Sequence, residues 1–244
     1  MVTRRGTLRV GGAVVAGLAG CLGDADRGEV SQRTPTDTPP RTGTEPPTGS
    51  PDERQSPSPE PGIDPATLPG HVRPGGDPPA VPGALTCEDD VFERRGGWID
   101  GSDLGWGAVT GENGRVLFGL RVDGLAFERG EAVTVTLTNV SGEERTTDNV
   151  HRSNFDVLTE ARWHDPRGWP DGQPKPVTDD LWSFAPGESH EWRFELTEDG
   201  VVEGGYPPHR DELVVCPGLP VGRYRFATAA PEGGDVAVAF DLTG

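Results

Sequence analysis

The chain has 244 residues, of which 40 are acidic and 22 basic, so its formal net charge is −18 at pH 7. A chain this acidic repels phosphate backbones, and we therefore expect no nucleic-acid partner. An anionic lipid surface repels it in the same way, so any attachment to a membrane must come from another source.

The amino-terminal segment has the order of an export signal. Arg4 and Arg5 precede a short apolar run, which ends in small residues before Cys21. Charged, apolar and small residues in this order predict a cleavable signal over residues 1–20. The segment resembles a twin-arginine signal, whose cargo crosses the membrane already folded, and residues 18–21 resemble a lipobox, in which Cys21 is lipidated. The resemblance implies a protein anchored by lipid at the extracellular face of the cytoplasmic membrane.

A membrane-spanning helix is the alternative interpretation of this segment. Only fourteen uncharged residues separate Arg9 from Asp24, and five of them are glycine. A spanning helix needs about twenty predominantly apolar residues, and each glycine weakens a helix by roughly 1 kcal/mol relative to alanine. The run is therefore too short and too rich in glycine to span a bilayer.

The next part of the chain is rich in proline, threonine, serine, glycine and acidic residues, with almost no apolar side chains. Such a composition cannot build a core that offsets the entropy lost on ordering. With Cys21 as its lipidated first residue, the segment 21–85 is predicted to be a disordered tether with local polyproline II character.

The composition changes at residue 86, where short alternating runs begin. No stretch shows a sustained helical period, and glycine, proline and aspartate separate the runs. This pattern predicts an all-β fold over residues 86–244, an antiparallel β-sandwich in a single domain. The predicted strands lie at residues 117–122, 133–138, 155–157, 161–163, 192–196, 224–226 and 236–242.

Cys87 and Cys216 remain as an even pair once Cys21 carries a lipid. Exported proteins meet an oxidising environment, so we expect a disulfide between them that closes about 130 residues. Two free thiols are the alternative.

Three motifs in the second half of the chain carry a family resemblance. Residues 138–141 read TNVS, residues 184–189 read FAPGES, and residues 222–226 read GRYRF. Over residues 115–244 the chain resembles a bacterial and archaeal immunoglobulin-like domain, which occurs in secreted lipoproteins and is similar to the intracellular proteinase inhibitor fold of bacilli. The resemblance implies an immunoglobulin-like sandwich and no catalytic residues.

Gly187, Gly222 and Tyr224 are the structural residues of these motifs. Gly187 and Gly222 each lie in a turn next to a strand. Tyr224 lies two residues before an inward core position, just after the Gly222 turn, which is the spacing of a tyrosine corner.

The charge composition carries a second resemblance. Lys175 is the only lysine among the 22 basic residues. An acid-rich, lysine-poor chain resembles proteins of halophilic archaea, in which molar salt screens the self-repulsion of the surface. A GC-rich genome explains the bias toward arginine, alanine and glycine equally well, but it does not explain the excess of acid.

We find no pattern typical of an enzyme, and we expect no catalytic residues, metal or cofactor. A blue-copper site needs two histidines, a cysteine and usually a methionine, but no histidine follows Cys216 and Met1 is the only methionine. His164 with Asp165, and His209 with Asp211, are interpreted as surface-loop residues. The acidic runs 88–90 and 179–180 are interpreted as solvated surface, with calcium binding as the alternative.

Two features are candidate binding or modification sites. Trp163, Trp169 and Trp182 lie in a proline-rich loop and form the candidate binding surface, because exposed tryptophans anchor partners and stack on sugars. Their alternative role is to cap one end of the sandwich as a minor core. Asn139 begins an N-glycosylation sequon, and its alternative role is that of a turn residue at a strand end.

Together these patterns predict a lipid-anchored cell-surface protein that displays a non-enzymatic immunoglobulin-like binding module. Its expected partners are the membrane, through the lipid, and an envelope protein or glycan. An extracellular proteinase inhibitor, and an accessory subunit of an envelope enzyme or transporter, are the alternatives.

Overall fold

The computed structural model describes residues 61–97, 99, 104–204, 209–230 and 233–244. The predicted signal, Cys21 and residues 22–60 of the predicted tether lie outside the described residues. The strands are β1 (Glu93–Arg94), β2 (Gly105–Trp106), β3 (Ala108–Thr110), β4 (Val116–Val122), β5 (Ala126–Phe127), β6 (Ala132–Asn139), β7 (Arg145–Thr147), β8 (Asn154–Leu158), β9 (Trp163–His164), β10 (Arg167–Trp169), β11 (Trp182–Phe184), β12 (Ser189–Glu195), β13 (Val214–Val215), β14 (Gly222–Ala230) and β15 (Gly234–Leu242). The helices are η1 (Pro65–Thr67), α1 (Glu198–Glu203) and η2 (Arg210–Glu212).

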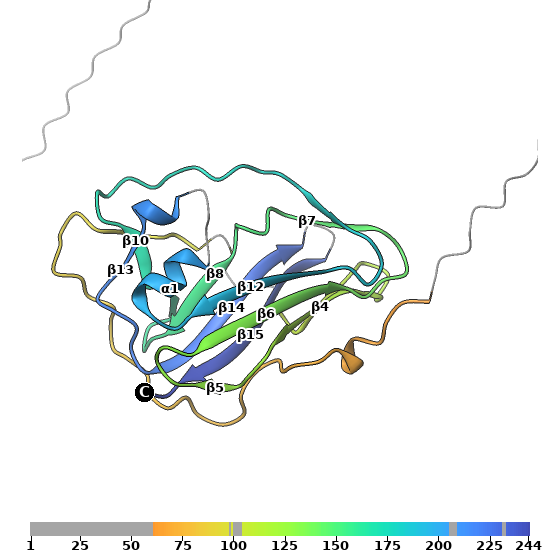
Figure 1. Ribbon diagram of the computed structural model, residues 1–244, viewed down its shortest axis with the longest axis horizontal. Helices are drawn as coiled ribbons and strands as arrows, with labels where there is room; N and C mark the ends of the chain where they lie inside the picture. The colour runs from red at the N-terminus through yellow and green to blue at the C-terminus, as the bar shows by residue number, and fades with distance from the viewer. Residues whose placement is uncertain (1–60, 98, 100–103, 205–208, 231–232) are drawn as a thin grey trace, which may run out of the picture. The chain divides into compact units, whose positions relative to one another are not determined.

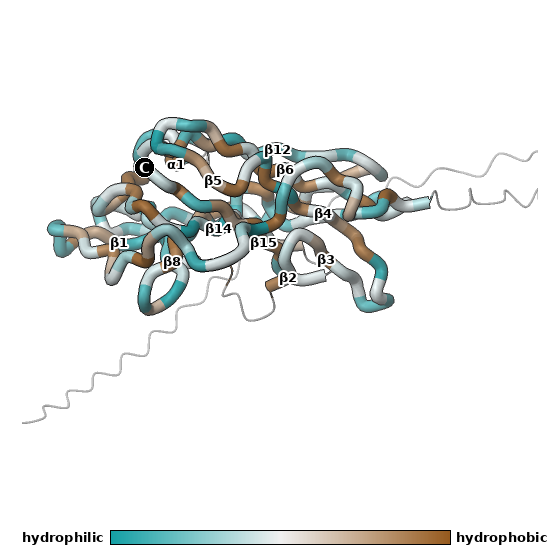
Figure 2. The backbone as a smooth tube through the Cα atoms, turned by 90° about the horizontal axis from the view of Figure 1, so that it is seen from below, coloured by the Kyte–Doolittle hydropathy of each residue, from teal (hydrophilic) through white to brown (hydrophobic). Residues whose placement is uncertain are grey.

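Two sheets form the sandwich (Figure 1). One has the strand order β12–β6–β4–β3 and the other the order β2–β15–β14–β8–β9. In Figure 2, β6 and β12 lie in one layer, and β8, β14 and β15 lie in the other. Most pairs are antiparallel, but β2 and β5 both pair with β15 in parallel. The all-β sandwich predicted from the sequence is confirmed.

Alternation along the strands decides which side chains enter the core. In β6, Val133 and Val135 are buried between half-buried threonines, as a strand with one face on the core requires. They face Phe194 and Trp192 of β12 in register, while the intervening residues of β12 are exposed. The predicted strand at 161–163 overlaps β9 only at Trp163; the other predicted strands fall largely within observed ones.

Aromatic rings fill the space between the sheets. Phe155, Phe194, Tyr224, Phe226 and Phe240 are all fully buried. Their ring centroids lie 5.3 Å apart for Phe155 and Phe194 and 5.5 Å apart for Phe194 and Phe226. At these distances tilted ring pairs stabilise a core beyond the area they bury. The centre of the molecule is thus apolar and aromatic.

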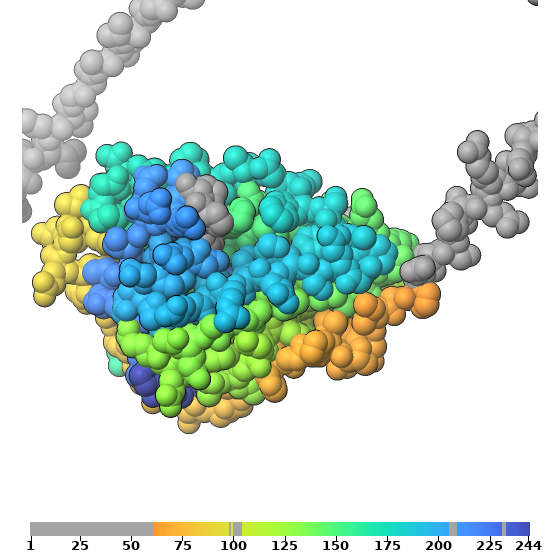
Figure 3. All heavy atoms as spheres, in the orientation of Figure 1, coloured from red at the N-terminus to blue at the C-terminus, as the bar shows by residue number. Residues whose placement is uncertain are grey.

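Residues 61–85, which we call the strap, lie along the sandwich (Figure 3). Ile63 N donates to Val140 O at 2.8 Å, and His71 exchanges two backbone hydrogen bonds with Val122 of β4. The carbonyl of the next residue, Val72, accepts a hydrogen bond from Ala239 N of β15, so the strap connects the two sheets. The boundary predicted at residue 85 was therefore placed too far along the chain.

Two glycines make room for the strap. A Cβ atom at Gly119 of β4 would overlap the Leu68 side chain, and one at Gly107 would lie 2.5 Å from Val72. Backbone pairing with both sheets and these two apolar contacts offset the conformational entropy that the strap loses on ordering. The composition of the strap had predicted too few apolar contacts to do this. Such pairing depends on sheet edges supplied by residues far along the chain.

The sequence analysis did not predict helix α1. Thr197 caps its amino end by accepting a hydrogen bond from Gly200 N at 3.0 Å, and Glu198 and Asp199 occupy the first turn. Val201 and Val202 are the buried residues of the helix. A helix of six residues is too short for its apolar period to be recognised, although the cap and the acidic first turn are visible in the sequence. None of the helices among the described residues has the length and apolar content needed to cross a bilayer.

Candidate functional site

A disulfide joins two distant segments at one end of the sandwich. Cys87 and Cys216 are bonded, with their Cα atoms 5.6 Å apart and a sequence separation of 129, which confirms the predicted pair. Cys87 precedes β1 and Cys216 follows β13, and both strands pair with β10. Cys216 N also donates to Pro166 O at 3.0 Å. The bridge therefore closes a small three-stranded sheet, rather than reaching the long strands of the sandwich.

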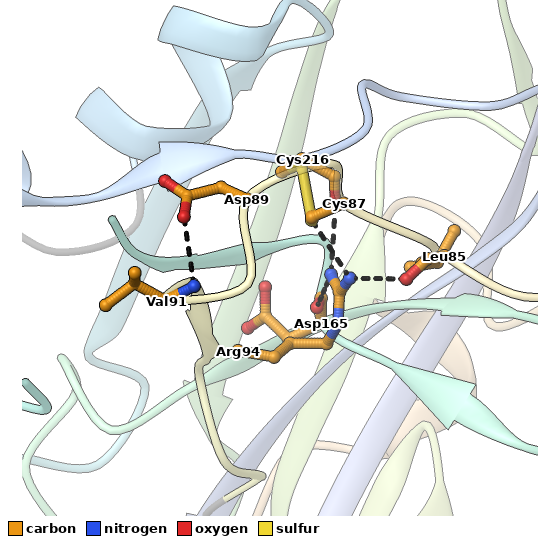
Figure 4. The surroundings of a disulfide bond; sticks show 7 residues. All are labelled: Leu85, Cys87, Asp89, Val91, Arg94, Asp165 and Cys216. Carbon is orange, nitrogen blue, oxygen red and sulfur yellow. Dashed lines mark hydrogen bonds between the residues drawn. A yellow bond between two sulfur atoms is a disulfide. The ribbon is translucent and has the colours of Figure 1, made fainter. Parts of the chain in front are cut away.

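Arg94 of β1 lies directly beneath the disulfide (Figure 4). Its Nη1 donates to the carbonyl oxygens of Asp165 and Cys216, each at 3.1 Å. Its Nη2 donates to Leu85 O at 2.7 Å and lies 3.6 Å from Cys87 Sγ. Burial lowers the pKa of Arg94 from its ordinary value, and the negative charge of Asp165 opposes that shift. One side chain thus fixes three segments relative to each other.

Behind Arg94 lies a buried carboxylate. Asp165 accepts hydrogen bonds from Arg167 Nε at 2.9 Å and from Arg167 Nη2 at 2.7 Å, and Arg95 Nη1 lies 3.9 Å from its Oδ2. All three side chains are almost completely buried. The interpretation of His164 and Asp165 as a surface-loop pair is wrong for Asp165. Two arginines surround this carboxylate inside the protein, because an unpaired buried charge is strongly unfavourable.

A second buried pair crosses the two neighbouring strands β8 and β14. Asp156 and Arg225 face each other in the register, and Asp156 Oδ2 accepts from Arg225 Nε at 3.0 Å and from Nη2 at 2.6 Å. Burial raises the pKa of Asp156, the charge of Asp165 raises it further, and Arg225 opposes both effects. The guanidinium carbon of Arg225 also lies 4.8 Å from the ring centre of Trp163.

These five residues account for every charged side chain that is buried in the described ranges: Arg95, Asp156, Asp165, Arg167 and Arg225. Alternation explains the position of two of them. In β8 and β14, the neighbours Phe155 and Phe226 point into the aromatic core, so Asp156 and Arg225 point to the outer face of the same sheet. Strand β1 and the residues after it, up to residue 97, lie beside that face, and both charged side chains are buried there.

Above the buried pairs lies a recess of about 510 Å³, which we call the arginine recess. Its walls combine four arginines with three carboxylates and the aromatic ring of Trp163. The charged residues are Glu93, Arg94, Arg95, Asp156, Arg162, Asp165 and Arg225. A local excess of positive charge is therefore present on a chain whose overall charge is −18. The arginine recess is the candidate functional site.

His164 also lines the arginine recess. Burial lowers its pKa, and the nearby charges of Arg162 and Arg94 lower it further, so the imidazole is neutral at physiological pH. In the part of the chain that the structure describes, no cluster of three or more histidine, cysteine or acidic side chains is placed to ligate a metal ion.

The three candidate tryptophans do not share a surface. Only Trp163 lines the arginine recess. Trp169 is buried and packs with Val202 and Leu213 in a separate cluster, which is the minor-core role considered as its alternative. Trp182 is partly exposed on β11, where its ring contacts His151 and His190. The predicted common binding surface is therefore wrong.

Asn139 has the role of a turn residue. It is fully buried, and its Nδ2 donates to the carbonyl oxygens of Glu143, Phe184 and Ala185 at 2.8, 2.9 and 3.1 Å. Its Oδ1 accepts from the backbone and the hydroxyl of Ser141. A glycan on this nitrogen would require the turn to open, so Asn139 is not a glycosylation site in the folded chain.

The three residues that the motifs predict to be structural lie in turns, at a strand end or in the core. Gly187 has φ of +78°, a conformation that favours glycine, and its N donates to Asn139 O at 2.9 Å. Gly222 begins β14. Tyr224 is buried and its hydroxyl donates to Pro220 O at 2.7 Å, which is the hydrogen bond of a tyrosine corner. Burial raises the pKa of Tyr224 well above its ordinary value.

The sequence analysis missed most of the arginine recess. The signal that was available is a charged residue between two core residues on each of two strands, Asp156 in β8 and Arg225 in β14. On a solvent-facing sheet this pattern is ordinary, so it did not indicate a buried pair. Comparison of the chain with known protein families finds none that matches, and comparison with curated proteins finds no match either.

Proposed function

We propose that the chain is an exported lipoprotein, held by a lipid on Cys21 at the extracellular face of the cytoplasmic membrane. In this proposal the residues after Cys21 tether a non-enzymatic, immunoglobulin-like binding module to the surface. The order of residues in the signal supports the anchor, and the pairing of the two remaining cysteines supports an oxidising compartment. The excess of acidic residues supports a halophilic source.

The observation that carries the binding role is the arginine recess. Hydrogen bonds from Arg94 and the disulfide fix its rim, and the buried pairs of Asp156 and Asp165 fix its floor. A recess whose donors are held in place before a ligand arrives loses little entropy on binding.

Part of the lining of the arginine recess lies far from the point where the described chain begins. Figure 1 shows residues 61–70 at one end of the sandwich and residues 88–97, which include part of this lining, at the other end. A module tethered through its amino end would therefore carry these residues at the end opposite its attachment. Within the binding class, a concave site favours an accessory ligand-binding subunit of an envelope enzyme or transporter over a proteinase inhibitor, which needs a protruding loop.

The anchor is tested by fractionating cells that produce the full chain. We expect Cys21→Ala to release the protein from membranes into the soluble fraction or the medium. Cys87→Ala is the matched control, since it removes a cysteine and the disulfide but leaves the lipid site, and it should stay with the membrane. Retention of Cys21→Ala in the membrane fraction would refute the lipid anchor.

The binding role is tested by affinity capture from envelope fractions with the full mature chain as bait. We expect a retained protein or glycan whose capture is lost with Arg162→Glu at the mouth of the arginine recess. Arg210→Glu is the matched control, because Arg210 is an exposed arginine that lies on η2 and does not line the recess. Equal capture by both variants would place binding elsewhere on the chain.

A further inference from the structure

The donor groups of the arginine recess are only partly used by the protein. Arg225 gives Nε and Nη2 to Asp156, and within the described part of the chain its Nη1 has no hydrogen-bond acceptor. Arg162 directly precedes β9 and lines the same recess. No acceptor for its guanidinium is found among the described residues. Two guanidinium groups are therefore placed to bind an anion. Arginine binds carboxylates through paired N–H groups of fixed geometry.

The acceptor groups limit which anion fits. Asp156 Oδ1 receives no hydrogen bond from the described residues, and Glu93 adds a second carboxylate to the wall. Hydroxyl groups of a ligand are suited to donate to these acceptors. The two carboxylates also repel doubly charged anions, of which sulfate has no donor to offer and hydrogen phosphate has one. The walls therefore fit a ligand with one negative charge and several hydroxyl groups.

Trp163 supplies the apolar part of the site. It is half-buried in the wall of the arginine recess, and Arg225 lies against its ring. An aromatic ring beside hydrogen-bonding groups packs against the C–H face of a pyranose, while its polar neighbours bind the hydroxyls. An aliphatic carboxylic acid offers no hydroxyl groups, so it leaves Asp156 Oδ1 and Glu93 without a hydrogen bond from the ligand.

From this combination we propose that the arginine recess binds a sugar acid, a pyranose that carries one carboxylate. Arg225 Nη1 and Arg162 bind the carboxylate, Asp156 and Glu93 accept hydrogen bonds from the hydroxyls, and Trp163 packs against the ring. This assignment rests on the proposed binding function and names its ligand class.

The test is calorimetric titration of the full mature chain with glucuronate and galacturonate, in one fixed salt concentration. Methyl glucoside and methyl galactoside serve as neutral controls, and sulfate serves as an anion without donors. We expect at least one sugar acid to bind, and to bind about tenfold or more tightly than its neutral counterpart, since hydrogen bonds to a charged group are stronger than those between neutral groups.

Variants separate the roles of the walls while both members of each buried pair are retained. Arg162→Glu and Trp163→Ala should each weaken binding about tenfold or more, whereas Arg162→Lys should retain part of the affinity. Arg210→Glu should leave it unchanged. Circular dichroism of each variant confirms that the sandwich is folded.

Three results would overturn the assignment. They are no binding of either sugar acid at millimolar concentration, equal binding of neutral sugars, and equal or tighter binding of sulfate. If envelope capture still depends on Arg162 while both sugar acids fail, the ligand class is wrong and the binding function stands. If both experiments fail, the arginine recess is not the functional site.

Discussion

The aromatic core and the arginine recess are buried to a similar degree but are held together differently. Phe194 and Phe226 contact several rings at once, and no single contact decides their position. Arg167 and Asp165 are held by directional hydrogen bonds to each other, and neither has a substitute partner of opposite charge at the same distance. The core tolerates small shifts of one ring, whereas the loss of one charged side chain in the floor of the recess leaves its partner buried without its hydrogen bonds.

This difference has an energetic side. Removing water from two charges opposes folding, and their mutual attraction only partly restores the loss. A buried ion pair is therefore weak evidence for stability, while the removal of one partner is strongly destabilising. The aromatic core supplies the stability of the sandwich, and the buried charges fix the geometry at one end of it.

Removing the disulfide has the largest expected effect on the recess end, by which we mean β1, β10 and β13 beside the arginine recess. Replacing both Cys87 and Cys216 by alanine should lower the free energy of unfolding by about 5 kcal/mol, because in the chain-entropy model a loop of this length is no longer closed in the unfolded chain. Chemical denaturation of both proteins in the same salt measures the change.

Hydrogen exchange then distinguishes the two regions. We expect amides of β1, β10 and β13 to exchange faster in the double variant, while amides in β6 and β14 remain the most protected. Unchanged stability, or amides of β1, β10 and β13 that keep their full protection, would contradict the view that the disulfide acts on the recess end.

A pair of double-mutant cycles compares the two regions directly. Arg167→Met should lower the free energy of unfolding by about 3–5 kcal/mol, because it leaves Asp165 buried with only the more distant Arg95 as a charge partner. Adding Asp165→Leu should restore much of this loss, since the uncompensated charge disappears as well.

In the core, Phe226→Ala should cost about 3–5 kcal/mol by leaving a cavity, and adding Phe194→Ala should lower the stability further. Denaturant titration of both single variants and the double variant at each site gives the six values that the two cycles need. If the double change at the recess is as additive as the double change in the core, the distinction between the two regions is wrong.

The sequence predicted the core well because its signal is local. Val133, Val135, Trp192 and Phe194 alternate with polar residues within their own strands, and a period of two is sufficient to assign one face to the interior. Which strands become neighbours was not needed for that assignment. The same local rule also identified the turn around Asn139 as an alternative to glycosylation.

The arginine recess could not be predicted in this way, because its burial depends on a distant segment. Asp156 and Arg225 have the alternation of residues that face solvent, yet they are buried, and residues 93–97 of a distant segment line the recess beside them. The order of the strap was not predicted for the same reason, since His71 and Val72 are held by hydrogen bonds to β4 and β15. Contacts across such sequence distances leave no periodic pattern in either partner.

The smallest expected effect concerns an exposed ion pair next to the recess end. Glu198 at the start of α1 accepts hydrogen bonds from Arg129 Nη1 at 2.7 and 2.9 Å and from Leu219 N at 3.2 Å. The Arg129 hydrogen bond is the main cause that lowers the pKa of Glu198 below its ordinary value of 4.5. Because the folded-state pKa is the lower one, the stabilisation is complete above pH 4.5 and is lost as the pH falls through that pKa.

Asp156 shifts stability in the opposite direction, so the wild-type curve alone does not isolate Glu198. Burial raises the folded-state pKa of Asp156 above its ordinary value of 3.8, so its effect on stability becomes less favourable as the pH rises through that range.

We therefore compare thermal unfolding of the wild type and Glu198→Gln from pH 7 down to pH 3. Both proteins contain Asp156, and its effect cancels in the difference. The variant should be less stable by about 0.2–1 kcal/mol at neutral pH, as for other exposed ion pairs, and the difference should shrink toward zero at the acid end. A difference that stays constant with pH would show that the substitution acts through packing, and that the charge of Glu198 does not connect α1 to the recess end.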